Sequence, residues 1–365
     1  MKYRDPLRQI LLLRRLHWDR RETHPAVRWA FTRAVGCRTL RFGGRLYASE
    51  SEERTFFNPC KNRACASCGH RASLQWRRER KAALPDVPYK GITFTMPNVL
   101  WNLFRENRNL AKALPTLAAL VIRTRQQVTC GLEVGVIAIF HSFNGKLEFN
   151  SHVHAMVTAG GLKGDSWVPS VYHNQDRLKE SWRRAVIALL RAALRSGTLQ
   201  TCMTVEELEL LLSSQENRWW SIKIQSFQSL EHFLEYAGRY LRRPPIAQRR
   251  ITYIGEQIVR FWYDDKKEHR RIELECSLEE FIDRWAQHIL ERYQHSVRNY
   301  GLFAPRSLGR TTAAIFVLLR QVPRPRPKPQ RWAKLIWQSF GRDPLVDSKD
   351  QQMRLLRRIP AISAV

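Results

Sequence analysis

The sequence predicts an α+β fold, an antiparallel sheet flanked by helices, preceded by a small cysteine-rich module. Three observations lead to this prediction. Short strand patterns alternate with amphipathic helical patterns along residues 89–293. Two of the strand patterns are joined by Asn144-Gly145, a pair that is typical of a tight hairpin. Three cysteines, Cys60, Cys65 and Cys68, cluster near the N-terminus.

The composition is that of a folded, strongly basic protein. Hydrophobic residues make up 44% of the 365 positions, which is enough for a globular core. Lys and Arg number 62 against 33 acidic residues, so the formal net charge is +29. Such a field attracts polyanions, above all nucleic acid. The sequence offers neither a membrane-spanning apolar run nor a signal peptide, and we therefore expect a cytoplasmic protein with no membrane partner.

The first expected domain, residues 1–84, is basic, helical and cysteine-rich, and we expect it to contact DNA. Within it, residues 1–35 have a helical pattern and residues 36–70 have turn signals typical of irregular structure. Residues 71–84 again have a helical pattern, which Pro85 brings to an end.

The second expected domain, residues 85–305, carries the sheet, and residues 306–365 form a basic C-terminal extension with a Pro-rich linker. We expect Pro115 to interrupt the first long helix. The expected strands are 91–96, 134–143, 146–161 and 218–225, with a further hairpin at 250–255 and 257–265. The expected helices are 99–130, 175–197, 205–215, 230–243 and 277–293.

A histidine pair lies inside the strand pattern FNSHVHAMVTAGG, residues 149–161. His152 and His154 are two residues apart, so both imidazoles point to the same face, with Cα atoms roughly 6.6 Å apart. That separation allows both rings to reach one metal ion. The alternative is a pair of hydrogen-bonded histidines near a strand edge.

The expected hairpin adds two more polar residues to this face. If Asn144-Gly145 forms a two-residue turn, His141 lies opposite Glu148, and both share the face of His152 and His154. His141 is the candidate for a third metal ligand, with packing or hydrogen bonding as its alternative role. Glu148 is a weaker candidate, since a solvated strand position is its ordinary place.

A tyrosine pair lies in YAGRY, on the helix expected at 230–243. Tyr236 and Tyr240 are four residues apart and share a helix face. Arg239, Arg242 and Arg243 surround them with positive charge, which favours the phenolate form of a side chain whose reference pKa is about 10. A phenolate can attack phosphorus. The alternative is a pair of core aromatics at helical spacing.

The cysteine cluster has the spacing of a metal site. Cys60, Cys65 and Cys68 follow a C-x4-C-x2-C pattern with His70 close behind. Three thiolates and one further ligand, either His70 or Cys37, would complete a tetrahedral zinc site. The alternative is a group of free thiols.

Together these motifs resemble the two-tyrosine HUH transposases of rolling-circle insertion sequences, of the insertion-sequence ninety-one type. SHVHAMVTAGG resembles the HUH motif, in which a hydrophobic residue separates two histidines. YAGRYLRRPPI resembles the paired-tyrosine helix, and CKNRACASC resembles the N-terminal zinc segment. The resemblance covers residues 25–305.

The resemblance implies an HUH nuclease palm that holds Mg²⁺ or Mn²⁺ through His152, His154 and a third ligand such as His141. One tyrosine would attack single-stranded DNA at the element ends, giving a 5′-phosphotyrosine and a free 3′-hydroxyl, and the second would serve transfer to the target. We expect Arg239, Arg242, Arg243 and Lys223 to contact DNA, and the protein to associate with the nucleoid; the alternative for Lys223 is an ordinary solvated lysine. The alternatives are a replication initiator or relaxase with the same chemistry, and a catalytically dead DNA-binding remnant.

One segment departs from the family pattern. The family usually has a further C-x2-C pair ahead of the cysteine cluster, and here Ser49 and Glu52 stand where those cysteines would fall. Zinc would then be held by the four thiols at positions 37, 60, 65 and 68, or the site is degenerate.

Overall fold

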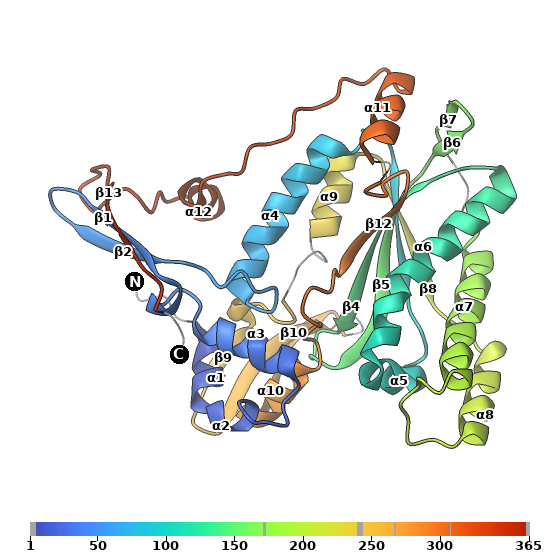
Figure 1. The fold of residues 1–365 in the computed structure, drawn as a ribbon, viewed down its shortest axis with the longest axis horizontal. Helices are drawn as coiled ribbons and strands as arrows, with labels where there is room; N and C mark the ends of the chain where they lie inside the picture. The colour runs from blue at the N-terminus through green and yellow to red at the C-terminus, as the bar shows by residue number, and fades with distance from the viewer. Residues whose placement is uncertain (1–4, 171–172, 239–243, 266–267, 307, 363–365) are drawn as a thin grey trace.

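A computed structural model describes residues 5–170, 173–238, 244–265, 268–306 and 308–362 of the chain. Its centre is a five-stranded antiparallel sheet with strand order β12-β4-β5-β3-β8 (Figure 1). The strands are β3 (Tyr89–Phe94), β4 (Gly135–Phe143), β5 (Phe149–Thr158), β8 (Ile222–Phe227) and β12 (Val297–Gly301). The predicted α+β class, with an antiparallel sheet flanked by helices, is confirmed.

Helices cover both faces of this sheet, as Figure 1 shows. One face packs against α5 (Trp101–Glu106), α6 (Arg108–Cys130) and α7 (Gln175–Arg195), and α8 (Val205–Glu216) packs on α7. The other face packs against α4 (Ala66–Ala83) and α9 (Leu230–Gly238). A hydrophobic core lies on each face of this sheet, because side chains alternate along each strand. Val153 and Ala155 face α6, whereas Met156 faces α9. None of the described helices is long and apolar enough to cross a membrane.

The break in the first long helix lies at Asn107 and not at Pro115, so that prediction was wrong. Pro115 is buried inside α6 and the helix continues through it. Asn107 instead separates α5 from α6, and its side chain donates to the carbonyls of Leu103 and Gln200, at 2.8 and 2.7 Å. Burial of α6 against the sheet outweighs the one backbone hydrogen bond that a proline removes.

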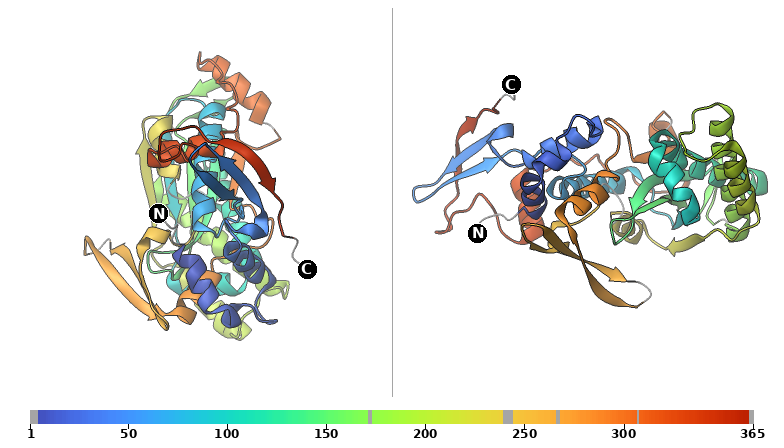
Figure 2. Two further views of the ribbon diagram at one scale, coloured as in Figure 1. Left: turned by 90° about the vertical axis from the view of Figure 1, so that its left-hand side faces the viewer. Right: turned by 90° about the horizontal axis from the view of Figure 1, so that it is seen from below.

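The N-terminal helices pack against a part of the chain that is distant in sequence. These are α1 (Pro6–Leu13), α2 (Arg15–Trp18) and α3 (Pro25–Val35), and they meet α10 (Leu278–Ala286) and the sheet β11-β10-β9. That sheet, seen at the lower edge in Figure 2, consists of β9 (Ile251–Ile254), β10 (Ile258–Asp265) and β11 (Arg270–Ser277). The rings of Phe31 and Trp285 lie 4.9 Å apart in the shared core. Contacts therefore cross the domain boundary expected at residue 84.

Residues 36–70 are not irregular throughout, contrary to our expectation. They contain β1 (Gly44–Ala48) and β2 (Glu53–Phe57), and β1 also pairs with the C-terminal strand β13 (Arg354–Ile359). A strand whose partner lies at the other end of the chain has no local signal. The remaining elements are β6 (Gly161–Lys163), β7 (Ser166–Val168), α11 (Leu308–Leu318) and α12 (Trp332–Phe340), and the Pro-rich stretch 322–331 is neither helix nor strand.

Candidate functional site

Three histidines come together on the face of the central sheet that α4 and α9 partly cover. His141 on β4 lies directly across from His152 on β5, and His154 is two residues further along β5. One ring nitrogen from each histidine lies within 4.8 Å of the others. His141 and His154 are buried, and His152 is half-buried. The predicted histidine face therefore exists, and it includes His141.

Hydrogen bonds orient two of these rings. The Nδ1 atom of His152 lies 2.7 Å from the carbonyl oxygen of Asn150. A carbonyl only accepts, so this Nδ1 carries the proton and leaves Nε2 as a lone-pair donor. The Nδ1 atom of His154 lies 3.2 Å from the Thr93 hydroxyl oxygen. Such partners hold metal-ligating imidazoles in one orientation.

Glu148 does not join this face, and the hairpin register that placed it there was wrong. The connection between β4 and β5 is five residues long, 144–148, and not a two-residue turn. Leu147 adopts a left-handed backbone, with φ of 61°, and its side chain is fully buried in the core beside α10. Burial of this leucine lengthens the loop, and Glu148 accepts a hydrogen bond from the Asn144 amide at 2.8 Å.

Tyr236 lies on α9 over the same face of the sheet. Its ring is 4.8 Å from the Phe227 ring and is nearly buried. A Cβ atom added at Gly91 would lie 3.0 Å from Cε1 of Tyr236, so the missing side chain at Gly91 makes room for the tyrosine ring. Gly91 and Thr93 are two residues apart on β3, so they lie on the same face of the sheet. The Tyr236 ring at Gly91 is therefore next along this face to Thr93, whose hydroxyl contacts His154.

Of the other residues predicted for this site, the structure describes only Lys223. Lys223 is exposed on β8 directly across from Thr93, which in turn pairs with His154. Residues directly across from each other share a face of the sheet, so the Lys223 side chain lies on the histidine face, two strands away from His154. Four predicted residues lie outside the described part of the chain: Arg239, Tyr240, Arg242 and Arg243.

Sequence reasoning missed Gly91 and Thr93. A glycine inside a strand pattern often marks the close approach of another group, and this signal was available in GITFTM. Thr93 carried no local signal, because its role depends on the pairing of β3 with β5.

Another histidine close to the site has a structural role. His288 on the loop after α10 donates from Nε2 to the Leu147 carbonyl at 3.1 Å, and its Nδ1 accepts from the Ser142 hydroxyl at 3.2 Å. Burial lowers its pKa to about 4, so the ring is neutral near pH 7. It ties the end of β4 and the loop after it to the segment that follows α10.

Four cysteines form the second cluster. The sulfur atoms of Cys37, Cys60, Cys65 and Cys68 all lie within 4.8 Å of one another, with Cys60 and Cys68 at 3.6 Å. Cys37 at the end of α3 completes the set, whereas His70 is exposed on α4 and is not part of it. Four thiols at these distances are the donor set of a structural zinc site.

The surroundings of the sulfurs fit a bound cation. The backbone amides of Cys60 and Asn62 point at the sulfurs of Cys37 and Cys60, both at 3.4 Å. The four thiols do not all ionise together: hydrogen bonding to Cys37 raises the pKa of the Cys60 and Cys65 thiols, whereas hydrogen bonding within the cluster lowers the pKa of Cys37 and Cys68. A divalent ion allows all four to ligate as thiolates.

The two positions where the resemblance expects further cysteines are used differently. The Ser49 and Ser51 hydroxyls donate to the Asp347 carboxylate at 2.6 and 2.7 Å. The hydrogen bond from Ser49 holds the pKa of Asp347 well below its usual range. Glu52 forms an ion pair with Arg54 at 2.6 Å. Polar contacts to the C-terminal segment therefore hold the β1–β2 hairpin.

Comparisons with known proteins cover the regions that carry both clusters. A family profile described as "Putative transposase" matches residues 135–310, and one described as "Transposase zinc-binding domain" matches residues 13–96. The histidine site and the described part of the tyrosine helix fall in the first match, and all four cysteines fall in the second. No solved structure matches the chain.

Two curated relatives span most of the chain. "Transposase for insertion sequence element IS801" from Pseudomonas savastanoi pv. phaseolicola is 30% identical over 315 residues, which cover 81% of this chain and 75% of that protein. "Putative transposase y4qJ" from Sinorhizobium fredii is 29% identical over 291 residues, which cover 74% of this chain and 72% of that protein. The chain therefore belongs to the transposases of the insertion-sequence ninety-one type, with an N-terminal zinc-binding segment.

Proposed function

We propose that this transposase nicks and rejoins single-stranded DNA through a 5′-phosphotyrosine intermediate in rolling-circle transposition. The observation that carries the proposal is the juxtaposition on one sheet face of three histidine nitrogens within 4.8 Å and the tyrosine helix α9. Its substrates would be the single strands at the ends of the element and at the target. Since the substrate is DNA, the proposal places the protein in the cytoplasm, associated with the nucleoid.

The histidine cluster fits a divalent metal ion. His141, His152 and His154 would hold the ion, and His152 already presents Nε2 as its lone-pair donor. Bound there, Mg²⁺ or Mn²⁺ would polarise the scissile phosphate as a Lewis acid. Imidazole is a ligand of transition metals, whereas Mg²⁺ prefers oxygen, so the donor set favours Mn²⁺ over Mg²⁺.

The chain's own residues supply the transfer step. The Tyr236 or Tyr240 hydroxyl oxygen forms a bond to phosphorus, while the bond from phosphorus to the 3′-oxygen breaks. The hydroxyl proton leaves the tyrosine, and the departing 3′-oxygen is protonated in turn. The covalent intermediate conserves the phosphodiester energy, and the second tyrosine permits a second transfer.

Basic side chains and the zinc module would bind the strand. In the proposal Lys223 contacts a phosphate beside the histidines, and Arg239, Arg242 and Arg243 do so around the tyrosines. Residues 85–305 would form the nuclease domain, residues 1–84 a zinc-binding DNA-contact domain and residues 306–365 a basic extension. The pairing of β1 with β13 joins the last two of these in space.

A covalent adduct is the test of this proposal. The protein is incubated with labelled single strands from its own element ends and Mn²⁺, Mg²⁺ or a chelator, and adducts are resolved on denaturing gels. We expect a metal-dependent adduct that is absent from the double variant His152→Ala/His154→Ala. The matched control His269→Ala, which removes an exposed histidine of the β10–β11 turn, retains it. Steeply salt-dependent DNA binding with no adduct would refute the proposal and indicate a DNA-binding remnant.

A further inference from the structure

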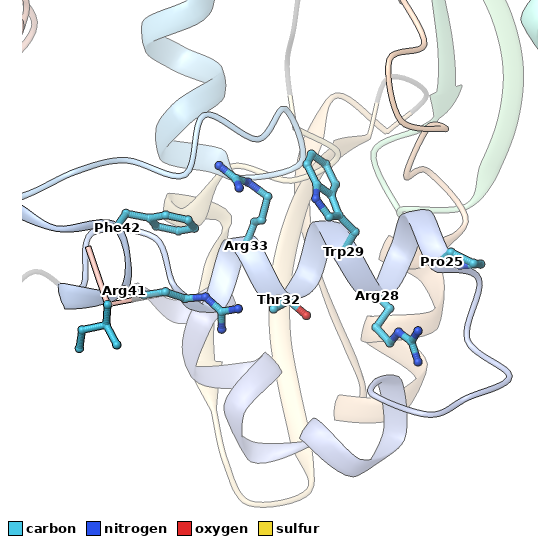
Figure 3. A pocket seen from close by; sticks show the side chains of 8 residues that line it. Pro25, Arg28, Trp29, Thr32, Arg33, Arg41 and Phe42 are labelled. Carbon is cyan, nitrogen blue, oxygen red and sulfur yellow. The ribbon is translucent and has the colours of Figure 1, made fainter. Parts of the chain in front are cut away.

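A pocket of about 470 Å³ lies beside the zinc module, and none of the three site histidines lines it (Figure 3). It opens between α3, the 3-10 turn Leu40–Phe42 and the C-terminal tail. Its lining combines arginines with two aromatic rings and contains no acidic residue: Pro25, Arg28, Trp29, Thr32, Arg33, Arg41, Phe42 and Ile362.

The aromatic rings offer stacking surfaces. Trp29 is 38% exposed, unusual for a tryptophan beside a folded core. The Arg33 guanidinium carbon lies 5.4 Å from the centre of the Trp29 ring and 4.8 Å from that of Phe42, so it bridges the two rings. Arg292 stacks on Trp29 at 5.0 Å. Planar cations over these rings mark surfaces on which a flat base can also stack.

The charge of the pocket is not neutralised internally. Within the described ranges, no carboxylate forms an ion pair with Arg28, Arg33 or Arg41. In Figure 3 Arg41 extends from the 3-10 turn toward Thr32, and Arg28 lies further along α3. Guanidinium groups without carboxylate partners are the usual ligands of a phosphate.

Residues of the zinc module hold the side chains of this pocket in position. Arg33 donates from Nη2 and Nε to the carbonyl oxygen of Cys60, at 2.7 and 3.2 Å, which fixes the guanidinium between the rings. Phe42 packs against the cysteine cluster. A Cβ atom at Gly36 would lie 2.6 Å from Cδ of Arg41 and 3.2 Å from Cε2 of Phe42, so the glycine leaves room for these two side chains beside α3.

We propose that this pocket binds one unpaired nucleotide of single-stranded DNA. The base stacks on Trp29 in place of the Arg292 guanidinium, while Arg33 keeps its position between the two rings and Arg28 and Arg41 hold the adjacent phosphate. The inference extends the DNA-binding role of a transposase and does not depend on the tyrosine chemistry, since a strand can be bound here whether or not it is cleaved.

The test measures affinity for three fluorescent probes: a short thymidine strand, the same strand with abasic sites, and a duplex. Loss of one stacked base corresponds to roughly a five- to 150-fold weaker affinity. We expect Trp29→Ala to weaken binding of the thymidine strand within that range and to leave the abasic strand and the duplex unchanged. Trp29→Phe restores most of the affinity. Equal weakening on all three probes, or none on any, overturns the proposal.

The arginines are tested on the same probes. Arg28→Ala and Arg41→Ala each lower the salt dependence of single-strand binding by about 0.7 in log–log slope, the value for one phosphate contact. Arg195→Ala, an exposed position at the end of α7, is the matched control and leaves the slope unchanged. An unchanged slope in both pocket variants contradicts the phosphate contact.

Zinc content and the melting temperature are measured for every variant, so that unfolding is distinguished from loss of the pocket. Adduct formation with a long substrate is measured in parallel. Normal adducts with an unaltered probe affinity would overturn the pocket alone, whereas absent adducts in the wild-type protein would overturn only the proposed nuclease.

Discussion

Gly91→Ala tests whether the close approach of Tyr236 to the sheet matters. The added Cβ atom would lie 3.0 Å from Tyr236 Cε1 and 3.1 Å from Phe227 Cε2. Carbon atoms prefer separations of about 3.5–4.0 Å, so the tyrosine ring must retreat by about half an ångström. Overpacking of this kind costs about 1–3 kcal/mol. Since a displacement of about 1 Å at a reacting group can cost about a hundredfold, we expect adduct formation to slow about tenfold.

The assay compares the initial rate of adduct formation and the free energy of unfolding. Gly309→Ala is the matched control, because beyond the nearby backbone of its own helix no atom lies within 4 Å of the position its Cβ would take. We expect this control to react at the wild-type rate. A Gly91→Ala protein with the wild-type rate and stability would show that the packing of Tyr236 on β3 is irrelevant to the reaction.

Three further perturbations test other parts of the structure. Thr93→Val removes the hydroxyl beside His154, and we expect Mn²⁺ affinity, measured by calorimetry, to fall about 10- to 100-fold. Thr95→Val, whose hydroxyl donates to a backbone carbonyl instead, leaves it unchanged. Chelation of zinc should expose the cysteine module to protease before the central sheet, as limited proteolysis would show; simultaneous cleavage of both would argue against a separate zinc-dependent unit. A second buried histidine, His173, lies just before α7 with its Nδ1 2.9 Å from the Gln126 amide nitrogen. Burial lowers the pKa of both His288 and His173 to about 4, so the unfolded state takes up their protons first as the pH falls below 6.5. Stability should therefore decrease by about 2 kcal/mol per histidine between pH 7.5 and pH 5 in denaturant titrations, and a flat profile would contradict burial of the neutral rings.

The histidine face could be predicted because side-chain alternation along a strand is local. His152 and His154 share a face whatever their partner strand, and the odd-numbered His141 reached the same face through the antiparallel pairing. Glu148 was misplaced because burial of Leu147, which depends on α10 and β10, lengthened the loop. Register and loop length are set by contacts that no local pattern contains.

The zinc ligands likewise combine a local pattern that could be predicted with a contact that could not. The spacing of Cys60, Cys65 and Cys68 was enough to predict a site, but the spacing alone left the fourth ligand open between Cys37 and His70; Cys37 was preferred only on the family resemblance, and the structure confirms it. Only the folded chain, in which the end of α3 meets the cysteine loop, distinguishes them. The strand pair β1–β13 could not be predicted, because it joins segments from opposite ends of the chain.

The most direct test of the proposed chemistry is to identify the amino acid that carries the DNA. The adduct formed with an element-end strand is digested with protease and nuclease, and the peptide bearing the residual 5′-nucleotide is sequenced by mass spectrometry. We predict that the nucleotide is attached to Tyr236 or Tyr240, and that the double variant Tyr236→Phe/Tyr240→Phe yields no modified peptide. A nucleotide attached to any other residue, or a modified peptide that persists in the double variant, would contradict the two-tyrosine mechanism.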